Sequence, residues 1–333
     1  MGVAQAATLP LETLAKSPLG VGVLGLGLIT ALYLSYSISC FVHFHFLHRS
    51  GLPRYQHPRD SKERAWALVT GASDGIGKGF AQELCHRGFN VVIHGRNKTK
   101  LRGVADDLKK DFPEATVRLA VLDAYPISEK TLDEMIASLD DLPVTVLINN
   151  VGGAGPIVPI FRQLNGLSYD DIATLIGINL DFAVALTAKL LPACRSRQPA
   201  LIINVSSFTA RVPSPYLCVY AGTKAFIESW SRSLASEMKA DGDDVEVLGL
   251  VVGEVAASFE REKPTSFVRP SSRAFARSAL DKVGCGRRII APYIGHDLAG
   301  IAMEILPQWG TDSVLIGVAR DMKRRAEKIA KEA

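Results

Sequence analysis

A tyrosine and a lysine stand one helical turn apart in the stretch Tyr220-Ala-Gly-Thr-Lys224, within a predicted helix over 219–240. Residues with this spacing lie on the same side of a helix, so the phenol and the ammonium should be neighbours. A nearby cation lowers the pKa of a phenol and makes it a better proton donor. Ser207 ends a predicted strand upstream, and open α/β sheets bind ligands at the carboxyl ends of their strands. The three side chains are therefore candidates for acid–base chemistry.

A glycine-rich turn is the second element with a chemical signature. The apolar run 65–71 has the character of a buried parallel strand, and the segment that follows the turn places Phe80, Leu84 and Cys85 on one helical face. In a strand, glycine turn and helix of this kind, backbone N–H groups at the helix N-terminus can bind a pyrophosphate. The predicted cofactor-binding residues of the turn are Gly71, Ser73, Asp74, Gly75, Ile76 and Gly77.

An earlier glycine motif, Gly20-Val-Gly22-Val-Leu-Gly25, also fits a dinucleotide fingerprint but lacks a preceding strand. From Ser17 to His48 the chain has no Asp, Glu, Lys or Arg, which predicts a transmembrane anchor over 19–42. A cleaved signal peptide is the competing interpretation, but the apolar run is long and starts late for one. The anchor divides a lumenal segment, 1–18, from a basic linker, 43–64.

Flanking charge predicts the orientation of this single span. Residues 1–18 carry one basic side chain, Lys16, whereas residues 43–64 carry five: Arg49, Arg54, Arg59, Lys62 and Arg64. The positive-inside rule then places the catalytic domain in the cytosol. The net charge of +4 is too small to indicate nucleic-acid binding, and neither the five cysteines nor the seven histidines show metal-site spacing. The tail, 311–333, is predicted to be a basic helix near the membrane.

The remaining chain alternates between strand-like and helix-like segments. This pattern predicts an α/β fold, a doubly wound parallel sheet of the Rossmann-like type, over a domain of 65–310. The predicted strands are 65–71, 89–97, 116–124, 144–152, 200–207 and 245–253, and the predicted helices are 99–110, 127–139, 168–193 and 219–240.

The end of the second predicted strand indicates the cofactor. NAD-binding sheets carry an Asp or Glu there to accept hydrogen bonds from the ribose 2′-hydroxyl. This chain has His94-Gly-Arg96-Asn97 instead, and Arg96 can pair with a 2′-phosphate, with Lys78 as a second cation nearby. We therefore expect NADPH or NADP+, with a simple surface charge as the alternative role of Arg96.

Together these features resemble the short-chain dehydrogenase/reductase family over about residues 64–300. Within the family the chain is most similar to the membrane-anchored 17β-hydroxysteroid dehydrogenases and very-long-chain 3-oxoacyl-CoA reductases. The similarity to that branch rests on the anchor, WALVTGASDGIGKGFAQEL, VPSPYLCVYAGTKAFIESWSRSLASEM and Pro292-Tyr-x-x-His296. The matching family elements are the Thr70–Gly77 turn, Asn149-Asn150-Val-Gly152, Asn179, Ser207 and Tyr220-x-x-x-Lys224.

The resemblance implies a role for each residue. The lysine ammonium and a nearby nicotinamide cation would lower the pKa of the Tyr220 phenol, which would donate a proton to a ketone that accepts hydride. Ser207 would hydrogen-bond the developing alkoxide. Lys224 would also hold the nicotinamide ribose, and Asn179 would anchor a water that relays protons to it. Asp123 would contact the adenine, and Asn150 and Tyr220 would join the cofactor-binding residues.

The expected function is NADPH-dependent reduction of a ketone, foremost a 3-oxoacyl-CoA in fatty-acid elongation at the endoplasmic reticulum membrane. The segment Gly153-Ala-Gly155-Pro156 replaces the branch's usual Ser-His, and the lid predicted near 254–290 lacks its usual Thr-x-x-Met. Reduction of a steroid, terpenoid or polyketide therefore stays open. A non-catalytic NADP-binding scaffold is a third possibility, which an intact Ser207, Tyr220 and Lys224 argue against. Expected partners are a lipid-like ketone or acyl-CoA, the membrane, and a second copy or an elongation-type complex.

Basic residues are abundant in the predicted lid and could steer an anionic acyl-CoA, although a solvated surface is the commoner role of such a set. They are Arg261, Lys263, Arg269, Arg273, Arg277, Lys282, Arg287 and Arg288.

Overall fold

The computed structural model describes residues 16–56, 64–257 and 263–332 of the 333-residue chain, with side chains as far as Lys328. Most of the predicted lumenal segment and Arg261 of the predicted lid lie outside these ranges. The chain divides into two units after His48.

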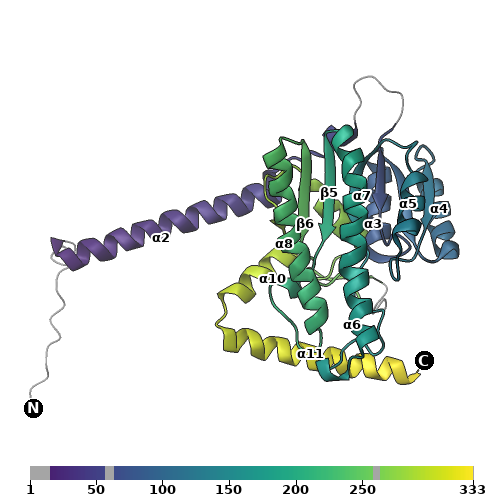
Figure 1. Cartoon of the computed structure of the whole chain (residues 1–333). Helices are drawn as coiled ribbons and strands as arrows, with labels where there is room; N and C mark the ends of the chain where they lie inside the picture. The colour runs from purple at the N-terminus through teal and green to yellow at the C-terminus, as the bar shows by residue number, and fades with distance from the viewer. Residues whose placement is uncertain (1–15, 57–63, 258–262, 333) are drawn as a thin grey trace, which may run out of the picture. The chain divides into compact units, whose positions relative to one another are not determined.

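The N-terminal unit contains one long helix, α2 (Pro18–Val42), which continues as a π-helical turn, η1 (His43–Leu47) (Figure 1). Ser17 caps its N-terminus by accepting a hydrogen bond from the Gly20 N–H at 3.0 Å. Large apolar side chains are exposed all around the helix, and the hydroxyls of Thr30 and Ser39 donate to carbonyls four residues earlier. Such a surface suits lipid, and the helix is apolar and long enough to cross a bilayer.

The second unit is built on one sheet of seven parallel strands in the order β3-β2-β1-β4-β5-β6-β7. Strands β1, β2, β4 and β5 are buried along their whole length, as expected for a sheet covered on both faces. The predicted doubly wound fold is confirmed, and the seventh strand was not anticipated because it has only two residues. The strands are β1 (Trp66–Val69), β2 (Asn90–Gly95), β3 (Val117–Val121), β4 (Val144–Asn149), β5 (Ala200–Val205), β6 (Val245–Leu250) and β7 (Ile289–Ile290).

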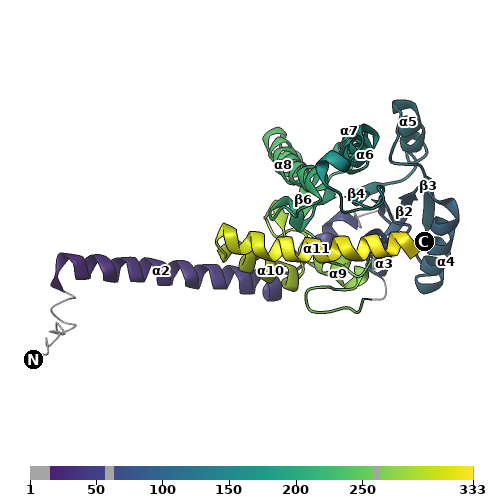
Figure 2. The same cartoon turned by 90° about the horizontal axis from the view of Figure 1, so that it is seen from below.

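Helices cover both faces of the sheet, with α3, α4 and α9 on one side and α5, α7 and α8 on the other (Figure 2). Helix α11 crosses the end of the sheet to which the strands point (Figure 1). The helices are α3 (Gly75–His86), α4 (Lys98–Asp111), α5 (Glu129–Ala137), α6 (Tyr169–Ile176), α7 (Phe182–Ser196), α8 (Cys218–Asp241), α9 (Ser272–Asp281), α10 (Ile294–Ile305) and α11 (Gln308–Glu332), with short turns η2 (Leu52–Gln56), η3 (Leu164–Gly166), η4 (Gly177–Asp181) and η5 (Phe208–Ala210).

The single helix predicted over 168–193 is divided by a π-helical turn, η4, between α6 and α7. At the first residue of this turn the Tyr125 ring lies so close to Gly177 that a Cβ on the glycine would be 2.1 Å from a ring carbon. The combined segment, Tyr169–Ser196, also has the length and apolarity of a membrane span, but half of it is buried in this unit. It is therefore a core element, and its π turn places Asn179 beside the site described below.

Helix α9 makes the second half of the predicted lid part of the core. Its residues Phe275 and Leu280 are fully buried, and Phe275 packs edge-on against Phe80 of α3. The buried carboxylate of Glu83 on α3 lies 3.5 Å from Arg273 and 3.6 Å from Arg277. Two of the basic residues expected to steer a ligand are thus engaged in fixing α9 to α3.

His94 of β2 is a buried titratable group in the core. Its ring stacks on Phe182 of α7, with ring centroids 4.8 Å apart and planes inclined by 22°. Loss of hydration lowers the pKa of His94 to about 4. The native protein therefore holds this imidazole neutral over a range in which the unfolded chain would protonate it.

We predict that this histidine makes the fold sensitive to acid. Because the pKa is 6.5 for an ordinary histidine and about 4 in the fold, the unfolded state binds more protons between these values. The contribution of His94 to the free energy of unfolding is complete above pH 6.5. It is lost as the pH drops towards 4, by on the order of 3 kcal/mol in total. Denaturant titrations across this range should show a weaker acid loss for His94→Leu; parallel curves for the two proteins would refute the assignment.

Candidate active site

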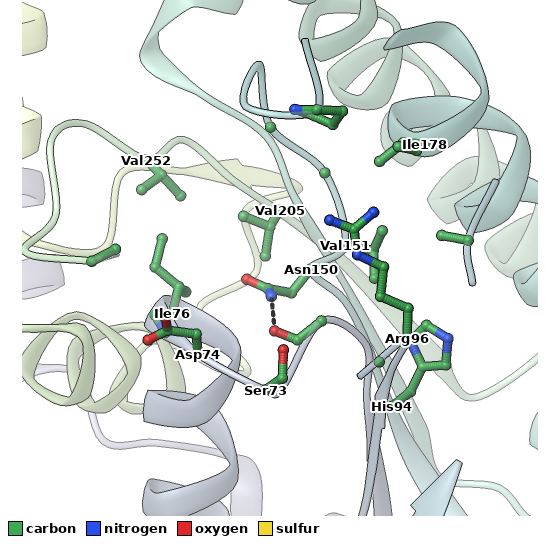
Figure 3. Close-up of a pocket in the computed structure, with 18 of the residues that line it drawn as sticks. Ser73, Asp74, Ile76, His94, Arg96, Asn150, Val151, Ile178, Val205 and Val252 are labelled. Atoms are coloured by element: carbon green, nitrogen blue, oxygen red, sulfur yellow. Dashed lines mark hydrogen bonds between the residues drawn. The ribbon is translucent and has the colours of Figure 1, made fainter. Parts of the chain in front are cut away.

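A cavity of about 400 Å³ opens at the carboxyl edge of the sheet, where β1, β2, β4 and β5 end (Figure 3). Most of the residues expected from the sequence to form the site line it, and the structure therefore brings together segments that are far apart in the chain. These residues are Gly71, Ser73, Asp74, Gly75, Ile76, Arg96, Asp123, Asn150, Ser207, Tyr220 and Lys224.

The glycine turn between β1 and α3 has the backbone that its sequence predicts. Gly71 and Gly75 have φ values of +64° and +56°, which favour glycine. Asp74 caps α3, with its carboxylate accepting a hydrogen bond from the Gly75 N–H at 2.7 Å. Gly77 does not line the cavity; a Cβ there would lie 2.3 Å from the Gly71 carbonyl oxygen. Its part is to let α3 approach the turn, which leaves the helix N-terminus facing the cavity.

Hydrogen bonds join this turn to the loop after β4. The Thr70 hydroxyl accepts from the N–H groups of Asn150 (2.8 Å) and Val151 (3.1 Å). In return, the Asn150 side-chain amide donates to the carbonyls of Thr70 (3.0 Å) and Gly71 (3.3 Å). Figure 3 shows this amide at the centre of the cavity wall. The role of Thr70 was not assigned from the sequence, although the residue belongs to the turn motif.

The β2 end of the cavity carries Arg96, whose exposed side chain lies beside His94 (Figure 3). Asp123, at the end of β3, lines the same region. The second predicted cation, Lys78, forms an ion pair with Asp107 of α4 at 2.7 Å and does not line this cavity. The structure therefore presents Arg96 as the cation available to a ligand at this end.

Lys224 and Tyr220 meet on one side of α8, as their spacing predicts. The Lys224 ammonium is buried, donates to the Val205 carbonyl at 3.0 Å and lies 5.7 Å from the centroid of the Tyr220 ring. Burial lowers the pKa of Lys224 to about 8. Burial also raises the pKa of Tyr220, opposed by a hydrogen bond with Ser207. The lowered phenol pKa expected from the sequence needs a nicotinamide cation beside the lysine, and it stays a prediction for the cofactor-bound protein.

Ser207 is oriented by a neighbour that the sequence analysis overlooked. Both the hydroxyl (3.0 Å) and the N–H (3.2 Å) of Thr209 donate to the Ser207 hydroxyl oxygen. A serine hydroxyl has two acceptor positions and one proton, so this arrangement leaves the Ser207 proton to be donated. The serine can therefore donate to the Tyr220 oxygen or to the oxygen of a substrate.

Asn179 lies behind the cavity wall and does not line it. Its amide oxygen accepts from the Gly153 N–H at 2.9 Å, and its amide nitrogen donates to the carbonyls of Gly153 (3.0 Å) and Leu175 (2.9 Å). A Cβ on Gly152 would lie 2.6 Å from the Asn179 oxygen and 3.0 Å from the Lys224 nitrogen. Asn179 thus fixes the glycine loop that separates it from the lysine.

His296, from the Pro292-Tyr-x-x-His296 motif, fixes the segment after β6. Its Nδ1 accepts from the Gly253 N–H at 3.2 Å, and its Nε2 lies 3.0 Å from the Glu254 carbonyl oxygen. The Glu254 carboxylate in turn pairs with Lys263 (2.6 Å) and with the buried Arg269 (3.0 Å). These two basic residues of the predicted lid therefore hold the loop beside Val252, which lines the cavity.

Comparison with known proteins agrees with this geometry. The family model for short chain dehydrogenases matches residues 65–266. A very-long-chain 3-oxoacyl-CoA reductase of Pyricularia oryzae is 32% identical to the chain, and the match covers 87% of this chain and 85% of that protein. The corresponding reductase of Mus musculus is 33% identical, and the match covers 80% of this chain and 83% of that protein. The corresponding protein of Coprinopsis cinerea is 33% identical, covering 93% of the chain and 92% of its own length.

Solved structures show the same fold. A 7β-hydroxysteroid dehydrogenase has a TM-score of 0.65 at 19% identity, covering 78% of this chain and 97% of its own. A short-chain dehydrogenase from Sphingobium yanoikuyae in complex with NADPH has a TM-score of 0.57 at 24% identity, covering 73% of this chain and 97% of its own. The family match, the broad coverage of the relatives and the shared fold establish that the chain belongs to the short chain dehydrogenase family, as an NAD(P)-dependent oxidoreductase that acts on CH–OH groups.

Proposed function

We propose that the protein catalyses the NADPH-dependent reduction of a 3-oxoacyl-CoA to a 3-hydroxyacyl-CoA, as a step of very-long-chain fatty-acid elongation. The observation that carries the proposal is the meeting of Ser207, Tyr220 and Lys224 at one end of a cavity whose other end presents Arg96. Relatives that share most of the chain are named for this reaction.

The cavity suits a phosphorylated dinucleotide along its length. The N-terminus of α3 and the glycine turn can bind the pyrophosphate, Arg96 the 2′-phosphate and Asp123 the adenine end. We assign Asn150 to the cavity wall between the pyrophosphate and the nicotinamide, and Tyr220 and Lys224 to the nicotinamide end of the cavity. The cofactor supplies a hydride when bound.

The catalytic side chains then act on the ketone oxygen. Ser207, with its oxygen already accepting from Thr209, donates a hydrogen bond to the developing alkoxide. Tyr220 donates the proton that completes the alcohol, and its raised pKa keeps the phenol protonated until that step. The neighbouring Lys224 ammonium stabilises the phenolate that remains. Asn179 positions the Gly152–Gly153 loop, and a water relay through it to Lys224 is part of the same proposal.

A second candidate is reduction of a bulky steroid, terpenoid or polyketide ketone. It is favoured by the loop Gly153-Ala-Gly155-Pro156, where small residues replace the Ser-His of the resembled branch; Gly153, Pro156 and the adjoining Gly152 line the cavity. A wider mouth of this kind would admit rings. A non-catalytic scaffold is set aside because the chain is an oxidoreductase with an intact Ser207, Tyr220 and Lys224.

We further propose that the anchor over 19–42 crosses the endoplasmic reticulum membrane once, with 1–18 lumenal and the reductase domain cytosolic. The uncharged helix α2 and the five basic residues of 43–64 support this orientation. The sequence Asn204-Val-Ser206 is a glycosylation sequon, and Asn204 is buried in β5 and hydrogen-bonded to Asn149 and Ser231. A glycan added there in the lumen would disrupt this packing, which supports a cytosolic domain. Assembly as a homodimer or within an elongation-type complex belongs to the same proposal.

The substrate class is tested with membranes that carry the protein. We expect NADPH oxidation with 3-oxoacyl-CoAs, increasing with chain length, and little with a panel of cyclic ketones. Membranes carrying the Tyr220→Phe protein provide the background rate. A preference for cyclic ketones would favour the second candidate and contradict the first.

Tyr220→Phe should abolish turnover while leaving NADPH affinity nearly unchanged, since the hydroxyl is the acid. We expect kcat to fall by about 10²–10⁴-fold, the usual contribution of a general acid. Lys224→Ala should impair both turnover and NADPH binding. Tyr169→Phe, at an exposed position of α6, is the matched control and should retain full activity. Loss of NADPH binding in Tyr220→Phe, or turnover near the wild-type rate, would contradict the assignment.

Arg96→Asp should shift the preference from NADPH towards NADH by roughly tenfold or more, the effect of losing one charge-assisted hydrogen bond. The new carboxylate repels a 2′-phosphate and can accept from a ribose 2′-hydroxyl. Ratios of kcat/KM for the two cofactors provide the measurement. Lys78→Gln is the matched control, because Asp107 already holds this lysine, and its preference should stay unchanged. A shift in the control alone would show that Lys78 binds the phosphate.

A further inference from the structure

An exposed apolar surface lies where helices α10 and α11 meet. In α10, Ile294, Leu298, Ile301 and Ile305 follow one another at spacings of three and four, which places them on one side of the helix. The chain then turns into α11 (Figure 1), and exposed apolar side chains continue through this turn. We call it the elbow surface; its members and their exposed fractions are Leu298 (41%), Ile301 (40%), Ile305 (77%), Leu306 (41%) and Trp309 (75%).

Residues outside the elbow surface hold both helices to the domain. In α10 the buried residues are Gly295 and His296, and His296 is fixed by the backbone of 253–254. In α11 Ala319 is buried, and the Lys323 ammonium lies 4.7 Å from the centroid of the Tyr216 ring. The domain contacts of α10 therefore lie opposite its exposed apolar side chains, whereas α11 is held by residues further along the helix than Trp309. The exposed apolar side chains of the elbow surface point away from the core.

Chain connectivity brings a bilayer to this domain. The apolar stretch long enough to cross a membrane ends at Leu47, and the domain begins within a few residues of it. Ser50 already donates from its hydroxyl to the Leu280 carbonyl, and the Gly51 N–H donates to the Val283 carbonyl at 2.8 Å. Three residues of extended chain span only about 10 Å. A span in the membrane would thus hold the domain against the membrane surface, whatever the angle between the two units.

The chemistry of the elbow surface matches a bilayer interface. Trp309 has a large apolar ring with one polar N–H, which favours the headgroup boundary. Trp309 and Arg320 share one side of α11 by their spacing, and Arg320 and Arg324, one turn later, are both exposed. An apolar surface continued by basic residues is the pattern that inserts into the interface while its cations face anionic headgroups.

We infer that the elbow surface is a second membrane contact of this protein, in which Ile305, Leu306 and Trp309 insert to the depth of the upper acyl chains of an anionic bilayer. The contact is separate from the N-terminal anchor. It fixes the domain's orientation, so that α11, which crosses the carboxyl end of the sheet, lies at the membrane surface (Figure 1). This inference depends on the anchor but not on the identity of the substrate.

Tryptophan fluorescence tests the contact directly. The full chain is reconstituted into vesicles of phosphatidylcholine and phosphatidylglycerol whose acyl chains carry bromine, which quenches a tryptophan at lipid depth. Of the three tryptophans, Trp66 is buried, Trp230 is half-buried on α8 and Trp309 is exposed. We expect strong quenching in the native protein and loss of most of it in Trp309→Phe.

A matched variant controls for general proximity to lipid. Lys110→Trp, made in the Trp309→Phe protein, places a tryptophan at an exposed position of α4. This helix packs on β2 and β3, at the edge of the sheet away from the elbow surface (Figure 2). We expect no bromolipid quenching there, and retained NADPH binding confirms that both variants are folded. Quenching of Trp309 by aqueous acrylamide alone would overturn the inference, because the surface would lie in water. Protection from both quenchers would also overturn it and indicate a protein partner instead.

Discussion

The hydrogen bonds between Thr70 and Asn150 are the constraint on which the rest of the site depends. They join the end of β1 to the loop after β4, so that the glycine turn and the catalytic half are held at a fixed spacing. Two close approaches lie beside this join: a Cβ on Gly77 would be 2.7 Å from the Asn150 amide nitrogen, and Gly152 lies between Asn179 and Lys224. A side chain at either glycine would push apart elements that the join holds together. A nucleotide bound across both halves would therefore reach the acid–base residues without rearrangement of the sheet.

Burial sets the protonation states within this frame. Lys224 has the Val205 carbonyl as a neutral partner, and burial lowers its pKa to about 8, so it is still mostly protonated near neutrality. Burial raises the pKa of Tyr220, which keeps the phenol protonated over the same range. A protonated phenol beside a cation is ready to donate a proton, whereas alcohol oxidation would require the phenolate. In the protein alone the phenol is therefore in the state that donates a proton, and a bound cofactor adds its own charge to this balance.

The sequence predicted the features that depend on local pattern. The six longer strands, the turn at Gly71–Gly77 and the shared face of Tyr220 and Lys224 follow from residue spacing within single segments. Features that depend on distant contacts were missed. The break before α7 occurs where the Tyr125 ring meets Gly177, and α9 joins the core because Glu83 of another helix pairs with its arginines. The raised pKa of Tyr220 likewise depends on tertiary burial, which spacing does not reveal.

The central claim is that this cavity passes a hydride from a nicotinamide to a carbonyl carbon, with protonation by Tyr220. Transfer of isotope tests it most directly. The purified protein is given NADPH fully deuterated on the reduced nicotinamide carbon, together with a long-chain 3-oxoacyl-CoA, and the product is analysed by mass spectrometry. The account predicts a single deuterium on the carbinol carbon of a 3-hydroxyacyl-CoA. Consumption of the labelled NADPH with no deuterium in the product would contradict it.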